Sequence, residues 1–174
     1  MKPANPTFYR TCRIEGARAY ELRQEIESFN CEYCAVLDSG QVEAWPDFFV
    51  EDGIYRVTAR ENAELGMPVG LVYAEGRDMM CDRAVAISRT QMFAPRYTLH
   101  IISNTRVTGE TELGEIEAQT NFLLLQTLID GRTTIHMAGT YYDRFVRRNG
   151  KLLLQERQAI YDSTIIDTDL VYPL

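Results

Sequence analysis

Histidine, lysine and tryptophan are scarce in this chain of 174 residues. It contains two histidines, two lysines (Lys2 and Lys151) and one tryptophan. A non-haem iron site made of two histidines and a carboxylate would consume both histidines. The sequence has neither a second Cys-x-x-Cys to complete a zinc site nor the paired Cys/His motif that holds a two-iron cluster. We therefore expect no metal and no cofactor on this chain.

The sequence also lacks long apolar stretches and any excess of positive charge. Apolar runs such as Phe122–Leu125 span only a few residues, whereas about 20 are needed to cross a bilayer. Acidic residues number 25 against 18 basic ones, so the net charge is −7 and binding to a phosphate backbone is disfavoured. No secretory signal is visible, and four cysteines are too few for a disulfide scaffold. These features predict a reduced, cytoplasmic protein without membrane or nucleic-acid partners.

The first half of the chain reads as an arm followed by helices. Residues 1–19 contain prolines and scattered arginines, which predicts an N-terminal arm before a single domain over 20–174. Apolar residues from Leu22 to Leu37 recur at helical spacing, and Gly40 suits the end of that helix. A short helix is expected over 42–49 with Pro46 in its first turn. The pattern then predicts a turn at 51–53 and a strand at 54–58. A loop over 61–76, which contains a short strand at 71–73, leads to a helix over 78–91.

The second half of the chain reads as long strands. Strand-like runs cover 98–108, 115–128, 133–146 and 152–161, with turns expected at 108–110, 130–131 and 149–150. The Asp130-Gly131 and Asn149-Gly150 dipeptides favour tight hairpins, in which both central residues take positive φ. Gly139 within a strand predicts a bulge or a bend. Helices followed by strands indicate an α+β fold, with N-terminal helices packed in a strongly curved antiparallel sheet that forms a cone.

Two groups of side chains suggest chemistry. Cys31 and Cys34 form a Cys-x-x-Cys, which we interpret as buried thiols because it lies within a predicted helix. His100 lies on a predicted strand, and Asp38 and Asp52 lie near the ends of predicted helices, where aspartate commonly caps. In a cone, either aspartate could meet His100 at the cavity and support general acid–base catalysis. That hypothesis is a stand-alone isomerase or dehydratase, and a ligand-binding module using the same cavity is a further alternative.

Five stretches occur in a fixed order and carry a resemblance. They are LDSG at 37–40, WPDFFVEDGIYRV at 45–57, DMMCDR at 78–83, LHIISNTRV at 99–107, and the run from GKL at 150 to Asp162. Together they resemble the small (beta) subunits of Rieske-type aromatic-ring-hydroxylating oxygenases, from about residue 20 to the C-terminus. The endings at 162–164 and 172–174 look closest to the terephthalate and salicylate branch.

The resemblance implies a nuclear-transport-factor-2-like cone and a non-catalytic role. It implies a subunit that stabilises an assembly with larger alpha subunits, commonly three alpha with three beta, for the breakdown of aromatic compounds. The alpha subunit would carry the Rieske [2Fe-2S] cluster and the mononuclear non-haem iron, with no catalytic residue on this chain. Arg83, Arg106 and Arg157 are then interpreted as structural ion-pair or interface residues, because arginine holds carboxylates bidentately.

Overall fold

The computed structural model describes residues 7, 9–90, 92–163, 165–166 and 169–174. The first part of the predicted arm, the expected helix end at Gln91 and residue 164 of the C-terminal motif lie outside these residues. None of the described helices combines the length and the hydropathy that crossing a membrane requires.

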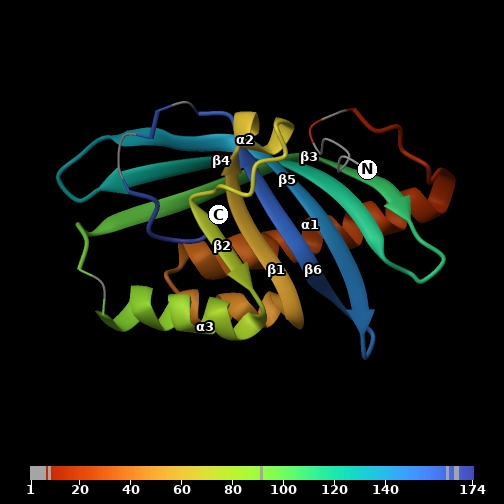
Figure 1. Cartoon of the computed structure of the whole chain (residues 1–174), viewed down its shortest axis with the longest axis horizontal. Coiled ribbons are helices and arrows are strands. Elements are labelled where there is room, and N and C mark those ends of the chain that lie inside the picture. The colour runs from red at the N-terminus through yellow and green to blue at the C-terminus, as the bar shows by residue number, and fades with distance from the viewer. Residues whose placement is uncertain (1–6, 8, 91, 164, 167–168) are drawn as a thin grey trace.

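A six-stranded sheet in the order β2-β1-β6-β5-β4-β3 curves around the longest helix (Figure 1). Its strands are β1 (Phe49–Ala59), β2 (Val72–Glu75), β3 (Arg96–Glu110), β4 (Ile116–Leu128), β5 (Thr133–Arg148) and β6 (Lys151–Tyr161). All neighbours run antiparallel except β1 and β6, which run parallel. The predicted antiparallel sheet is therefore mixed at one place. No tight turn joins β1 to β6, so turn geometry does not fix their relative direction.

The helices are α1 (Gly16–Asp38), α2 (Arg60–Glu64) and α3 (Arg77–Val85), with a 3-10 helix η1 (Val42–Phe48) and a π-helix η2 (Ala86–Thr90). Figure 1 shows α1 lying across one face of the sheet and α3 lying below β1 and β2. Glu43 of η1 forms an ion pair with Arg89 of η2 at 2.6 Å, which links the two short helices. Hydrogen bonds from Arg89 and Ser88 lower the pKa of the Glu43 carboxyl from 4.5 to about 2.

Several predicted boundaries are wrong in informative ways. The predicted turn at 51–53 lies inside β1, because the pairing with β6 shifts register between Phe49 and Ile54 and absorbs it as an irregularity. Pro46 is the fifth residue of η1 rather than part of its first turn. The predicted turn at 108–110 lies inside β3, and the chain reverses at 111–115, where Gly114 has a φ of 78°. The predicted third helix changes to π geometry after Val85.

The glycines of the second half show what the backbone requires. Asn149 and Gly150 have φ of 54° and 77°, as a tight hairpin predicts, whereas Asp130 and Gly131 are not among the residues with positive φ. A Cβ on Gly139 would lie 2.1 Å from the carbonyl oxygen of Ile160. Gly139 therefore marks a close approach of β5 to β6. The irregularity of β5 against β4 lies a few residues earlier, between Ile135 and Met137.

Candidate functional site

The interior of the cone is filled by aromatic side chains and by the last residues of the sequence. Leu174 is fully buried. Its carbonyl accepts a hydrogen bond from Tyr33 Oη at 2.8 Å, and its N–H donates to Tyr55 Oη at 2.7 Å. Trp45 Nε1 donates to Tyr33 Oη at 2.8 Å, and the Trp45 and Tyr55 rings pack edge to face at 4.9 Å. The aromatic cluster around Trp45 is thus packed core.

Burial changes the acidity of these tyrosines. Desolvation raises the pKa of Tyr55 to about 12, although its hydrogen bond with Leu174 and the charge of Arg83 work against the rise. Desolvation likewise raises the pKa of Tyr33 well above its ordinary value. Both hydroxyls therefore stay protonated at neutral pH. They act here as hydrogen-bond partners for the backbone of Leu174.

The structure brings His100 and Asp38 together. Asp38 is the last residue of α1, and its Oδ1 lies 2.6 Å from Nδ1 of His100 on β3. Its other oxygen accepts a hydrogen bond from the backbone N–H of His100 at 2.9 Å. Because β3 is an edge strand, this carboxylate covers an otherwise unpaired edge N–H. Asp52, the second candidate, is exposed on β1, and no hydrogen bond joins its side chain to His100 within the described part of the chain.

The His100–Asp38 pair has the hydrogen bond of a general base but not the surroundings of one. The His100 side chain is fully buried, and its Nε2 has no hydrogen-bond partner among the described residues. A catalytic base must reach a proton on a substrate, directly or through one water. Here Nε2 is out of contact with solvent. The pair therefore joins the end of α1 to the edge of the sheet.

Arg157 is the centre of a buried polar network. Its guanidinium donates to both carboxylate oxygens of Asp143, at 2.9 and 2.7 Å, and to Oδ1 of Asn30 at 2.5 Å. The rings of Tyr33 and Tyr141 enclose it, each with its centroid 4.2 Å from Cζ. Desolvation would lower the pKa of Arg157, but the charge and hydrogen bonds of Asp143 outweigh it and raise that pKa. The network ties α1 to β5 and β6.

The other two candidate arginines make different contacts. Arg106 donates to the side chain of Gln119 at 3.1 Å and to the carbonyl of Arg10 at 2.8 Å. Its guanidinium lies 5.1 Å from the ring centroid of Tyr9, so Arg106 fastens the N-terminal residues to β3. Arg83 is half-buried on α3 and forms no ion pair within the described residues.

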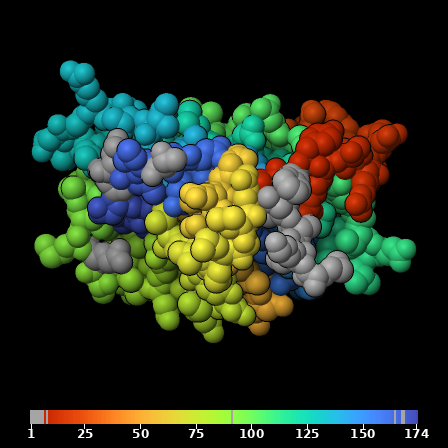
Figure 2. Space-filling view, turned by 45° about the horizontal axis from the view of Figure 1, so that its top comes forward, coloured from red at the N-terminus to blue at the C-terminus, as the bar shows by residue number. Residues whose placement is uncertain are grey.

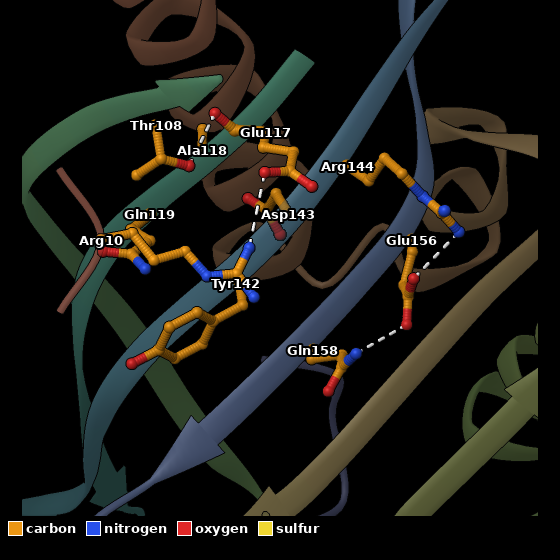
Figure 3. A pocket seen from close by; sticks show the side chains of 10 residues that line it. All are labelled: Arg10, Thr108, Glu117, Ala118, Gln119, Tyr142, Asp143, Arg144, Glu156 and Gln158. Carbon is orange, nitrogen blue, oxygen red and sulfur yellow. Dashed lines mark hydrogen bonds and ion pairs between the residues drawn. The ribbon is translucent and has the colours of Figure 1, made fainter. Parts of the chain in front are cut away.

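A small polar hollow lies on the outer face of the sheet (Figure 3). It has a volume of about 160 Å³. Arg10 pairs with Glu117 at 3.4 Å across it, and Arg144 pairs with Glu156 at 3.0 Å. Gln158 donates a further hydrogen bond to Glu156 at 2.7 Å. The charges are already paired, so the hollow presents no surplus charge to a ligand.

The cysteines do not form a reactive pair. Cys31 is exposed and Cys34 is buried, and both are free thiols. Desolvation raises the pKa of Cys34 to about 12, which removes the thiolate that redox chemistry and metal binding require. Within the described residues, no group of three or more His, Cys, Asp or Glu side chains is arranged to hold a metal ion.

Neither the buried role of Asp143 nor the contacts that Arg10 makes from the arm were predicted from the sequence. Tyr141, Asp143 and Phe145 all point inward from β5, and this alternation within a strand run was the available signal for Asp143. A charged residue on the inward face of a strand requires a buried partner. The contacts of Arg10 depend on the path of an irregular segment, and no periodic pattern predicts such a path.

A curved mixed sheet around one long helix (Figure 1), with a filled interior, defines a nuclear-transport-factor-2-like cone. The ring hydroxylating beta subunit family matches residues 34–168. Subunit beta 1 of the terminal oxygenase component of terephthalate 1,2-dioxygenase from Comamonas sp is 35% identical over 150 residues, covering 86% of this chain and 97% of that one. The anthranilate 1,2-dioxygenase small subunit of Burkholderia cepacia is 32% identical over 150 residues, covering 86% and 92%.

A solved structure agrees with these relatives. A chain from Novosphingobium aromaticivorans, assigned as the beta subunit of an aromatic-ring-hydroxylating dioxygenase, superposes with a TM-score of 0.81 at 34% identity. The match covers 89% of this chain and 98% of that one. This chain belongs to the ring hydroxylating beta subunit family.

Proposed function

We propose that this chain is the non-catalytic small subunit of an aromatic-ring-hydroxylating oxygenase, and that it stabilises the assembly of larger, iron-carrying alpha subunits. Membership of the ring hydroxylating beta subunit family is the observation that carries the proposal. The alpha subunit would carry the Rieske [2Fe-2S] cluster and the mononuclear non-haem iron. The complex would contain three copies of each subunit, lie in the cytoplasm and act in the breakdown of aromatic compounds.

The filled interior supports this role over the stand-alone enzyme. An isomerase or dehydratase built on the cone needs a cavity beside its acid–base residues. In this chain Leu174 and the rings around Trp45 fill the interior, and the Nε2 atom of His100 is buried without a hydrogen-bond partner among the described residues. A substrate would have to displace the side chains that bury Nε2 to reach His100.

The outer face of the sheet also supports an assembly role. Leu99 pairs in register with Leu125 on β4, which pairs with Ile135 on β5. Tyr97 and Ile101 lie on the same face of β3, and their side chains are 71% and 47% exposed. Monomeric proteins rarely expose contiguous apolar patches of this kind, and the core of a permanent interface is apolar and depleted of charge. This face therefore favours a subunit that works within a complex.

Native mass spectrometry of the tagged chain, purified from its own host grown on an aromatic carbon source, tests the proposal. We expect a complex with equal numbers of this chain and a larger, iron-containing chain. Three of each would match the proposed stoichiometry. Recovery of the chain alone, as a monomer or dimer, under conditions in which the large subunit is expressed would contradict the proposal.

A further inference from the structure

An exposed apolar stripe lies between α2 and β2, at the opposite edge of the sheet from β3. Five large side chains at alternate positions of residues 65–73 face solvent, with exposures of 67% for Leu65, 46% for Met67, 59% for Val69, 48% for Leu71 and 49% for Tyr73. We call these five residues the 65–73 stripe. Figure 2 shows this part of the chain, in yellow to yellow-green, at the middle of the face that is turned towards the viewer.

The backbone of the stripe is fixed against β1. The N–H of Leu71 donates to the carbonyl of Val57 at 2.8 Å, and Oγ1 of Thr58 donates to the carbonyl of Val69 at 2.7 Å. A Cβ on Gly70 would lie 2.5 Å from the Val57 carbonyl oxygen, so glycine is required for this close approach. The chain thus holds a defined path while its apolar side chains stay in water.

Such exposure is costly unless a partner covers it. Burial of apolar surface is the main favourable contribution to association, and this chain leaves five large apolar side chains among nine consecutive residues largely exposed. Tyr73 lies in β2 and Leu71 directly precedes it, and β2 pairs on only one side. Leu65 lies in the turn that ends α2, and the segment after it carries large apolar side chains at every second position, a pattern that suits docking into an apolar groove of another protein.

The charges beside the stripe indicate which partner it fits. Glu61 and Glu64 precede it on α2, and Glu75 and Asp78 follow it on β2 and α3. Of the arginines nearby, Arg60 is held by Asp162 at 2.5 Å, and Arg56 lies over the ring of Tyr73 at 5.7 Å. Arg77, the first residue of α3, is the third, so four carboxylates face one arginine that has neither an acidic partner nor a ring contact among the described residues. Carboxylates therefore dominate the rim, on a chain whose net charge is −7. A second copy would present the same acidic rim, and like charges facing each other oppose association.

We propose that the 65–73 stripe is the surface that docks the large oxygenase subunit, at an apolar groove with a basic rim. This inference rests on the proposed function, because it names the partner surface of the same assembly. The apolar side chains supply the buried area, and the carboxylates of α2 and β2 orient the encounter.

Co-expression with the tagged large subunit of the same organism tests the proposal. The double variant Leu65→Asp/Val69→Asp places charge in the stripe, and we expect it to reduce the amount of small chain recovered per large chain about tenfold or more. Leu113→Asp is the matched control, because Leu113 is 92% exposed but lies in the turn between β3 and β4. It should leave the recovered ratio unchanged. Both variants change exposed side chains, so their thermal unfolding should follow that of the wild type.

A second variant tests the charge argument separately. Glu61→Lys/Glu64→Lys should slow association with the large subunit and remove much of its dependence on salt, because charge on the rim of an interface acts mainly on the association rate. Unchanged kinetics in this variant would overturn the assignment of a basic rim to the partner.

The possible outcomes separate this proposal from the proposed function. A folded stripe variant that is recovered with the large subunit at the wild-type ratio would overturn the stripe and leave the proposed function intact. A stripe variant that changes only the self-association of the isolated chain would show that a second copy is the occupant, and would also overturn the proposal. Failure of the wild type to bind the large subunit would overturn the proposed function, and the stripe proposal with it.

Discussion

Replacing Arg157 by methionine should be among the most destabilising single changes in this chain. Arg157 and Asp143 have no exposed side-chain surface, and the guanidinium bonds both carboxylate oxygens at 2.9 and 2.7 Å. Arg157→Met keeps an unbranched side chain between the rings of Tyr33 and Tyr141 but leaves Asp143 buried without its partner. Removing one member of a buried pair costs about 3–5 kcal/mol. For a protein of this size, that corresponds to a fall in Tm of roughly 6–20 °C.

Urea denaturation followed by tryptophan fluorescence provides the assay. Trp45 is the single tryptophan, is fully buried and donates a hydrogen bond to Tyr33, so its emission reports the core directly. Arg144→Met is the matched control on the same sheet. The side chain of Arg144 is 40% exposed and pairs with Glu156, and pairs of this kind contribute about 0–1 kcal/mol.

The double variant Arg157→Met/Asp143→Leu completes the cycle. It removes both charges, so its loss should be clearly smaller than the sum of the single losses. Arg157→Met costing no more than Arg144→Met would refute the reasoning, because the buried pair would then behave like an exposed one.

Three further predictions concern the edge strand, the close approach of β5 to β6, and pH. Asp38→Ala should lower the free energy of unfolding by about 1–3 kcal/mol, because it leaves the backbone N–H of His100 without its hydrogen-bond acceptor. Asp52 is exposed, so Asp52→Ala should change that free energy by no more than about 0.5 kcal/mol. Equal losses for the two variants in urea denaturation would refute this. Gly139→Ala should lower the free energy of unfolding by about 3 kcal/mol or more, or abolish soluble expression, because its Cβ would collide with the carbonyl oxygen of Ile160. Wild-type stability of this variant in urea denaturation would contradict the close contact. The carboxyl carbon of Glu43 should titrate near pH 2 by NMR, because Arg89 lowers its pKa; its stabilising effect is then present above about pH 4.5 and lost as the pH falls towards 2, and a midpoint at 4.5 would refute it.

The fold was largely predictable because its strands and its long helix follow simple periodicities. Leu22, Ile26 and Leu37 all lie buried on α1, and Asn149-Gly150 makes the expected tight hairpin. The parallel pairing of β1 with β6 was missed, because strand direction between elements far apart in sequence leaves no local pattern. The predicted turn at 108–110 is wrong because β3 continues through Gly109, which pairs with Glu117 directly after a register shift.

The candidate site was predictable only where the type and position of a residue indicate what it must contact. His100 and Asp38 do meet, as the cone fold predicts for a strand histidine and an aspartate at a helix end. The burial of His100 Nε2 and the position of Leu174 beside Tyr33 and Tyr55 come from contacts between residues far apart in the sequence, and no local pattern predicts them. The 65–73 stripe shows the same limit. The glycines and the proline between its apolar residues predict a loop. Only the structure shows that these apolar side chains are exposed.

Turnover of the assembled oxygenase tests the central claim, a non-catalytic subunit, most directly. Complexes of the large subunit with wild-type chain and with His100→Asn chain should be purified to the same subunit ratio and iron content, and their product formation per large subunit compared. Asparagine retains a donor towards Asp38 but cannot act as a base. We expect equal turnover from the two complexes. A loss of about a hundredfold or more in an intact complex would contradict it, because losses of that size accompany removal of a general acid or base.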